Sequence, residues 1–449
     1  MPSADAAFPA GFIWGAATAA YQIEGAANEG GRGQSIWDTF SHTPGKITNG
    51  DTGDVACDHY HRFLEDIALM RELGLGAYRL SIAWPRIFPS GGGRPNSAGI
   101  DFYKRLVEAV RTAGIEPYVT LFHWDLPQTL QDAGGWTNRD TVGRFGEYAH
   151  AVAAALGDDV HHWTTHNEPW VFSVLGNLMG LHAPGRRDLA ATVQTAHHLL
   201  LSHAEAMEAI RAETSAGDQV GITLNLAPVE PSGDSNADAE AAERMDAFLN
   251  RWFLDPLFRG SYPDTLLRML GDMAPPVQAN DMARIAAPID FLGVNYYFRS
   301  VVRHDPSVPT TQATMVTPPG RPTTATGWEV YPEGLHDVLM RVHQDYAPVA
   351  LYVTENGAAF DDRLIDGRVV DPERQAYLHD HLLQALRAIE AGAPLRGYFA
   401  WSLLDNFEWS HGYSKRFGLI YVDYGTQERT IKESGRWYAG VTRENGVRG

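Results

Sequence analysis

Eight short apolar runs recur along this chain of 449 residues, and each is followed by a polar or helical stretch. The runs are rich in β-branched and aromatic residues, which is typical of strands that are buried on both faces. They lie at Phe12–Gly15, Ala77–Ile82, Pro117–Phe122, His162–Thr165, Val220–Leu224, Phe291–Asn295, Ala350–Thr354 and Gly397–Trp401. No low-complexity linker separates them, so the runs belong to one repeating architecture.

Amphipathic helical patterns lie between the runs, over Asp58–Leu73, over Ile100–Thr112 and from Pro372 onward. In the first, Phe63, Leu64, Ile67 and Met70 are spaced to line one apolar face. Eight strands that alternate with helices predict an α/β fold, a closed (β/α)8 TIM barrel with long βα loops. An open, doubly wound sheet is the alternative. Length alone suggests about three domains, but the repeating pattern predicts a single barrel domain over residues 1–449.

Composition excludes several classes of function. The chain has 36 basic and 55 acidic residues, a formal charge of −19, which argues against nucleic acid or an anionic membrane as a partner. Cys57 is the only cysteine, so there is no internal disulfide and no multi-cysteine metal site. The uncharged stretch Ala6–Ile23 has no preceding Lys or Arg and is interrupted by proline and glycine, unlike a signal peptide. We therefore expect a cytoplasmic protein.

Polar side chains follow most of the predicted strands, at the end of a barrel where chemistry takes place. The groups are Trp84-Pro85-Arg86, His123-Trp124-Asp125, His166-Asn167-Glu168-Pro169, Asn295-Tyr296-Tyr297, Glu355-Asn356-Gly357 and Trp401-Ser402. One face of the barrel should thus collect two carboxylates, Glu168 and Glu355, together with amides, an imidazole and indoles.

Two carboxylates that face one pocket are the minimum requirement for glycoside hydrolysis, in which they act as acid and as nucleophile or base. The two roles require unlike environments and unlike pKa values. Indole rings offer flat surfaces for a sugar, and amides offer directional hydrogen bonds. The same residue types could instead bind Mg²⁺ or Zn²⁺, and their spacing does not separate a glycosidase from a metal-dependent barrel enzyme. No G-x-S-x-G or H-E-x-x-H motif is present.

Four segments together resemble glycoside hydrolase family 1, the retaining β-glucosidases, from end to end. Phe8–Gly25 is similar to the family's N-terminal signature, and Thr165–Trp170 is similar to its acid/base motif. Tyr352–Gly357 is similar to its nucleophile motif, and Ala400–Trp409 is similar to its sugar-binding segment. The resemblance implies that the uncharged N-terminal stretch is the first barrel strand, and that the single barrel domain is catalytic.

The resemblance also implies roles for individual residues. Glu168 would be the general acid and then the base, and Glu355 the nucleophile, with Arg79 and Tyr297 beside it and Asn295 supporting Glu168. Residues expected to contact the substrate are Gln22, His123, Asn167, Glu408 and Trp409 by hydrogen bonds, Trp401 by stacking, Trp124 on the face of the pocket, and Trp328 beside the leaving group. No metal or cofactor is expected.

Two positions narrow the expected substrate. Family members that act on 6-phosphorylated sugars usually carry Ser where this chain has Glu408, and a thioglucosidase branch carries Gln where it has Glu168. A charged Glu408 would repel phosphate, so we expect neutral β-glucosides and short β-linked oligosaccharides, with overlapping β-galactosidase and β-fucosidase activity. The alternatives are a 6-phospho-β-glycosidase and a non-catalytic sugar-binding protein. His166 departs from the usually apolar residue there, and we expect it to fill the barrel rather than act on Glu168.

Overall fold

Eight parallel strands close into a barrel in the computed structural model, which describes residues 6–448. Around the ring the strands follow chain order: β2 (Ile13–Ala17), β3 (Ala77–Ser81), β4 (Glu116–Phe122), β5 (His162–Asn167), β6 (Gln219–Asn225), β8 (Phe291–Asn295), β11 (Leu351–Asn356) and β12 (Leu395–Trp401). Each strand coincides with a predicted apolar run to within two residues at either end. The closed barrel is therefore confirmed, and the open sheet is excluded.

The strands read as apolar runs because both of their faces are buried. All five residues of β3 and all five of β8 are buried. The barrel interior is filled by side chains from strands that are not neighbours: the ring of Tyr118 lies 4.8 Å from that of Phe399 and 5.7 Å from that of Tyr352. The barrel is thus a packed core, and a substrate can enter only at an end.

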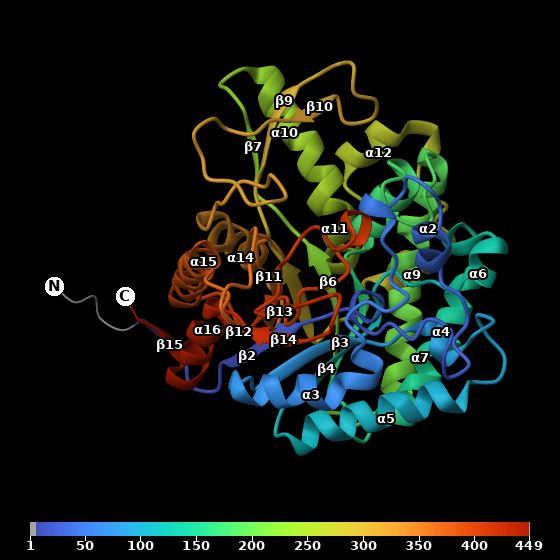
Figure 1. Ribbon diagram of the computed structural model, residues 1–449. Coiled ribbons are helices and arrows are strands. Elements are labelled where there is room, and N and C mark those ends of the chain that lie inside the picture. The colour runs from blue at the N-terminus through green and yellow to red at the C-terminus, as the bar shows by residue number, and fades with distance from the viewer. Residues whose placement is uncertain (1–5, 449) are drawn as a thin grey trace.

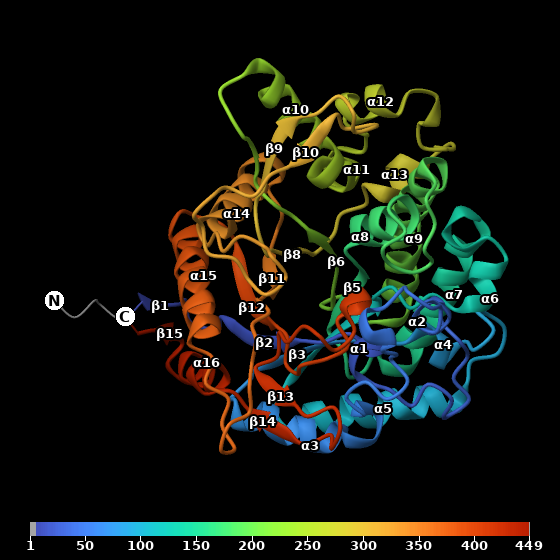
Figure 2. The same ribbon diagram turned by 45° about the horizontal axis from the view of Figure 1, so that its top comes forward.

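Helices surround the strands on the outside (Figure 2). The longer ones are α3 (His59–Glu72), α5 (Ser97–Thr112), α7 (Asp140–Leu156), α9 (Leu189–Glu213), α14 (Glu333–Tyr346), α15 (Pro372–Glu390) and α16 (Glu433–Glu444). The three predicted helices correspond to α3, α5 and α15. None of the helices within residues 6–448 combines the length and apolar character needed to cross a bilayer.

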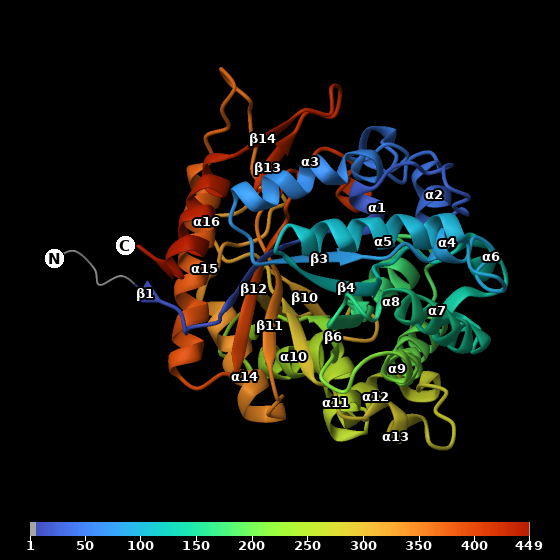
Figure 3. The same ribbon diagram turned by 90° about the horizontal axis from the view of Figure 1, so that it is seen from below.

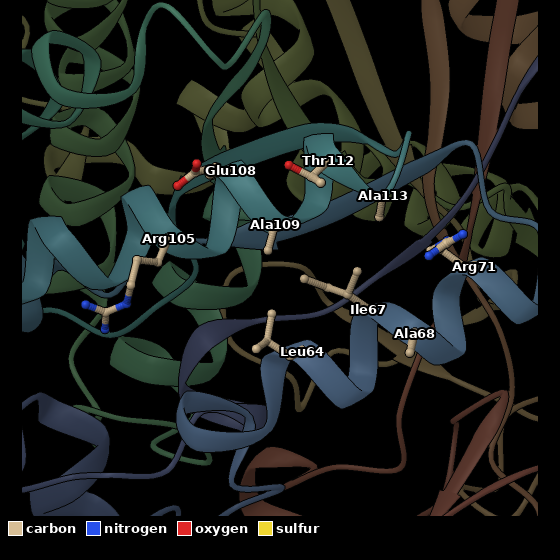
Figure 4. A pocket seen from close by; sticks show the side chains of 9 residues that line it. All are labelled: Leu64, Ile67, Ala68, Arg71, Arg105, Glu108, Ala109, Thr112 and Ala113. Carbon is tan, nitrogen blue, oxygen red and sulfur yellow. The ribbon is translucent and has the colours of Figure 1, made fainter.

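One prediction for α3 was wrong. Leu64 was expected on the buried face, but it is 65% exposed, whereas Met70 is fully buried. At about 100° per residue, Leu64 lies about 120° around the helix from Met70, at the edge of the apolar stripe. There it lines an open groove of about 340 Å³ between α3 and α5, which lie side by side on the outside of the barrel (Figures 3 and 4). The groove contains none of the sequence-predicted site residues.

The βα loops are long, as predicted, and those after β6 and β8 build a small layer of their own (Figure 1, top). In it β7 (Val229–Pro231), β9 (Ser300–His304) and β10 (Ala313–Met315) form a sheet that α10 (Asn236–Asp246) covers. Elsewhere β1 (Ala6–Ala7) pairs with β15 (Gly446–Val447), so the first and last described strands lie side by side (Figure 2).

Candidate active site

All the sequence-predicted site residues lie in a barrel strand or in the loop that follows it. They are Gln22 after β2; Arg79 in β3; His123 and Trp124 after β4; Asn167 and Glu168 at the end of β5; Asn295 and Tyr297 at the end of β8, with Trp328 in the same long loop; Glu355 in β11; and Trp401, Glu408 and Trp409 at the end of β12. Contacts between their side chains link them into one site.

Both oxygens of the Glu355 carboxylate accept a strong hydrogen bond. Nη1 of Arg79 donates to Oε1 at 2.5 Å, and the hydroxyl of Tyr297 donates to Oε2 at 2.6 Å. Glu355 and Arg79 are buried, at 3% and 1% exposure. An ionised carboxylate only accepts hydrogen bonds, and here each of its two oxygens faces a donor. The environment of Glu355 therefore suits a nucleophile.

Glu168 lies in the opposite kind of environment. Its Oε1 accepts one hydrogen bond, from Nδ2 of Asn295 at 2.8 Å, and within residues 6–448 it forms no ion pair. Burial, together with the nearby charge of Glu355, raises the pKa of Glu168 to about 8. The raised pKa favours the protonated carboxyl at neutral pH, where an ordinary glutamic acid is almost fully ionised. Glu168 is thus poised as an acid.

The local backbone directs Glu168 into the site. The pairing of β5 with β6 shifts between Thr164 and Asn167, which is typical of a bulge that redirects side chains. Glu168 itself has a φ of 47°, in the left-handed region, and costs on the order of 1 kcal/mol there. Pro169 then starts helix α8 (Pro169–Ser173). Two other residues of the site, Trp124 and Trp409, also have positive φ values, of 79° and 48°.

Asn167 connects the two carboxylates. Its Oδ1 accepts from Nη2 of Arg79 at 2.7 Å and from Nδ2 of Asn295 at 3.1 Å. The Asn295 amide is oriented in turn by Thr354, whose hydroxyl donates to Oδ1 at 2.7 Å. Arg79 and Asn295 each therefore contact Asn167 and one of the two carboxylates, so the relative positions of Glu168 and Glu355 are fixed by one network.

Two side chains keep free hydrogen-bonding atoms. His123 accepts at Nε2 from the Asn167 amide at 3.0 Å, which assigns its proton to Nδ1; burial and the charge of Arg79 hold its pKa well below the usual range. Gln22 donates from Nε2 to Oδ1 of Asn406 at 3.0 Å. Among the described residues, Nδ1 of His123 and Oε1 of Gln22 have no partner although both are buried. One donor and one acceptor thus remain for a polar ligand.

Aromatic rings line the same region. Trp401 is stacked on His123 with ring centres 6.0 Å apart. The ring centres of Trp124 and Trp409 are 4.6 Å apart. Nε1 of Trp124 donates to the backbone oxygen of Asn167 at 2.8 Å, so this indole also holds the end of β5. Trp328 lies 5.3 Å from Tyr297, on the Glu355 side.

Glu408 alters one sequence-based expectation. Its Oε2 accepts from Nε2 of Gln22 at 3.4 Å, and burial with the nearby Glu355 raises its pKa to about 8. Close carboxylates do not ionise together, so Glu408 is largely uncharged at pH 7. Repulsion of a phosphate by charge, as predicted from the sequence, is therefore weakened at neutral pH, because the raised pKa favours the uncharged form of Glu408.

His166 has a structural role, as expected, but in a different place. Its Nε2 lies 2.9 Å from the hydroxyl of Ser202 on α9, and its ring is stacked on Phe145 of α7 at 4.5 Å. The side chain thus fills the layer between β5 and the helices, not the barrel interior, because successive strand residues point to opposite faces. It does not contact Glu168.

Sequence reasoning missed several residues that complete the site. Thr354 lies inside the nucleophile motif Tyr352–Gly357, and Asn406 lies inside the sugar-binding segment Ala400–Trp409, so both could have been identified from these segments. Trp37 gave no such signal: it lies in α2 (Ile36–Ser41), yet its ring is 4.4 Å from Trp409. Within residues 6–448 no three His, Cys, Asp or Glu side chains gather as metal ligands would.

Comparison with known proteins shows which family the chain belongs to. Residues 4–447 match the model of "Glycosyl hydrolase family 1". The chain is 49% identical over 442 residues to "Beta-glucosidase A" of Thermotoga maritima, covering 98% of each chain. It is 46% identical over 463 residues to a "Bifunctional beta-D-glucosidase/beta-D-fucosidase" of Bifidobacterium breve, covering 98% of this chain and 99% of the relative.

A solved structure agrees in fold as well as in sequence. A family 1 glycoside hydrolase of Thermotoga maritima, "complexed with a cyclophellitol analogue transition state mimic", superposes with a TM-score of 0.96 at 49% identity, covering 98% of this chain and 99% of that one. With the family model matching nearly its whole length, the chain belongs to glycosyl hydrolase family 1.

Proposed function

We propose that this chain is a retaining β-glucosidase that hydrolyses terminal, non-reducing β-D-glucosyl residues, with Glu168 as acid/base and Glu355 as nucleophile. The observation that carries the proposal is the unlike environment of the two glutamates within one network. Arg79 and Tyr297 bond to Glu355, whereas burial keeps Glu168 protonated. Residues 1–449 would act as one catalytic barrel domain, of which residues 1–5 and 449 lie outside the described part.

In the first step the Glu355 carboxylate attacks the anomeric carbon, and Glu168 gives its proton to the departing glycosidic oxygen. The bond between sugar and leaving group breaks as the ester to Glu355 forms, which inverts the anomeric centre. Tyr297 and Arg79 orient the attacking carboxylate, and Asn295 orients Glu168. The leaving group would depart past Trp328.

In the second step Glu168 acts as a base. Formation of the ester removes the charge of Glu355, which is one cause of the raised pKa of Glu168. The pKa of Glu168 therefore falls, and its carboxylate can take a proton from water as the water attacks the anomeric carbon. The second inversion restores the β configuration and frees Glu355.

The remaining residues would bind the sugar. Oε1 of Gln22 and Nδ1–H of His123 offer an acceptor and a donor. Glu408, beside Gln22, would contact the 4- and 6-hydroxyls, and Trp401 would stack beneath the ring. Asn167 would contact the 2-hydroxyl, a bond that strengthens in an oxocarbenium-like transition state. Short β-linked oligosaccharides and aryl β-glucosides fit such a site, and overlapping β-fucosidase and β-galactosidase activity is part of the proposal.

The pH dependence should identify the acid. Because the protonated form of Glu168 is the active one and its pKa is raised to about 8, kcat/KM for an aryl β-glucoside should fall as the pH rises through about 8. Glu408 has a similar raised pKa and is the matched control. We expect Glu408→Gln to keep this alkaline decline and Glu168→Gln to lose it. The reverse pattern would assign the acid role to Glu408.

Initial rates on four substrates test the proposed function. The protein is assayed with aryl β-glucoside, β-galactoside, β-fucoside and β-glucoside 6-phosphate, each with and without a chelator. We expect turnover of the neutral sugars that a chelator leaves unchanged. Preference for the phosphorylated sugar would make the chain a 6-phospho-β-glycosidase, loss of activity with chelator would favour a metal-dependent enzyme, and binding without turnover would indicate a sugar-binding protein.

A further inference from the structure

Behind the candidate site six charged side chains form a buried cluster, drawn from separate parts of the chain: Asp362, Asp371, Arg374, Asp405, Arg416 and Lys432. Five of them are at most 2% exposed, and the Arg416 side chain is 17% exposed. Three cations face three anions, so the buried charge cluster is neutral. Such a cluster tolerates its desolvation only while every partner is present.

Lys432, which directly precedes α16, bridges two loops within the buried charge cluster. Its Nζ lies 2.5 Å from Oδ2 of Asp362 and 2.6 Å from Oδ1 of Asp405. Asp362 lies in the loop after β11, the strand that carries Glu355, and Asp405 lies in the loop after β12. One fully buried ammonium thus joins the loops that follow two neighbouring barrel strands, β11 and β12.

Asp405 is rigidly held and lies next to sugar-binding residues. Besides Lys432, its carboxylate accepts from Nη1 of Arg416 at 2.7 Å and from the backbone N–H of Gly418 at 2.9 Å. The next residue, Asn406, accepts the hydrogen bond of Gln22, and Glu408 follows two positions later. A shift of Asp405 would therefore move the partners of Gln22 and the carboxyl of Glu408 together.

We propose that Lys432 is a positioning residue that sets the selectivity of this site for the C6 hydroxymethyl group of the sugar. It does so by fixing segment 402–409, which contains Glu408 and Trp409, relative to β11. This inference rests on the proposed function, because it takes Glu408 and Gln22 as ligands of the 4- and 6-hydroxyls. Lys432 contacts neither Glu408 nor Glu355; it acts through Asp405 and Asp362.

Loss of the ammonium should affect binding more than chemistry. Without Lys432 the buried charge cluster carries an excess negative charge, and Asp362 and Asp405 repel each other in a medium that screens poorly. The two loops should then move apart. The partners of Glu355 are unaffected, because Arg79 lies in β3 and Tyr297 follows β8. Sugar contacts at C6 should weaken while the reaction centre stays assembled.

Lys432→Met, which keeps the length of the side chain without its charge, tests the proposal. kcat and KM are measured on 4-nitrophenyl β-glucoside and on the β-xyloside, which lacks the C6 hydroxymethyl group. We expect the ratio of kcat/KM values, glucoside over xyloside, to fall by about tenfold through a raised KM for the glucoside, as lost hydroxyl recognition predicts. An unchanged ratio in the folded variant would overturn the proposal.

Arg139→Met is the matched control, since it removes a cation from another buried carboxylate, Asp281, whose other partners are His197 and the backbone of Gln278 rather than segment 402–409. It should lower thermal stability without altering the ratio. If Lys432→Met does not fold, Asp362→Ala removes the acceptor in the first loop and keeps the Lys432–Asp405 pair; an unchanged ratio there also contradicts the proposal. Failure of the proposed function itself would appear earlier, as a wild-type protein that does not hydrolyse the glucoside.

Discussion

Glu355→Gly should abolish hydrolysis of β-glucosides, with kcat falling by about 10⁵-fold, because the group that forms the covalent intermediate is gone. The protein should remain folded: the substitution leaves space, and Arg79 keeps its second acceptor at Asn167. Activity is measured on 2,4-dinitrophenyl β-glucoside, whose leaving group departs without help from an acid.

Rescue by azide tests whether the activity lost in Glu355→Gly was lost because the nucleophile is missing. In Glu355→Gly the small anion can enter where the carboxylate was, next to the cation of Arg79 and the hydroxyl of Tyr297. It should attack from the face that Glu355 occupies, restore release of the phenolate and yield the α-glucosyl azide after a single inversion. No rescue, or a β product, would mean that Glu355 is not the nucleophile.

Glu168→Ala should show the second large effect, and its size should depend on the leaving group. Loss of general acid assistance should lower kcat/KM on cellobiose by about 10²- to 10⁴-fold, because a sugar alkoxide cannot leave without a proton. On 2,4-dinitrophenyl β-glucoside the first step should be nearly unchanged. The glycosyl-enzyme should then accumulate, because its hydrolysis lacks the base, and a burst of phenolate should be followed by slow turnover.

Azide again separates the roles of the two glutamates. In Glu168→Ala it should attack the accumulated glycosyl-enzyme from the face opposite Glu355, raise the steady-state rate and give the β-glucosyl azide. The two variants thus predict opposite anomers of one product. Equal losses of activity on cellobiose and on the dinitrophenyl glucoside would contradict an acid role for Glu168.

The apolar runs predicted the barrel and the two carboxylates at its strand ends, whereas the proposed sugar-binding residues followed only from the family resemblance. Strands buried on both faces must be continuously apolar, and barrel chemistry must follow the strand ends, so the eight runs led directly to Glu168 and Glu355. The error at Leu64 arose at the edge of an apolar stripe, where helical spacing alone does not distinguish buried from exposed positions. Trp37, in a loop helix, had no periodic signal.

The chemical states of those residues could not be predicted from the sequence. The raised pKa of Glu168 depends on burial and on Glu355, which is 187 positions away in the chain. The proton on Nδ1 of His123 follows from a hydrogen bond to Asn167, and the uncharged state of Glu408 from its surroundings. No sequence motif surrounds Lys432, and a role for it is indicated only by its contacts with the two loops that it joins.

The anomer of glucose that is released first tests the central claim, double displacement at Glu355, most directly. Proton NMR follows the wild-type enzyme with an aryl β-glucoside in D₂O, at enzyme levels high enough for turnover to outpace mutarotation. We expect β-glucose as the first product, with the α anomer appearing only later by mutarotation. If α-glucose appears first, water attacks directly, and Glu355 is not a nucleophile in this protein.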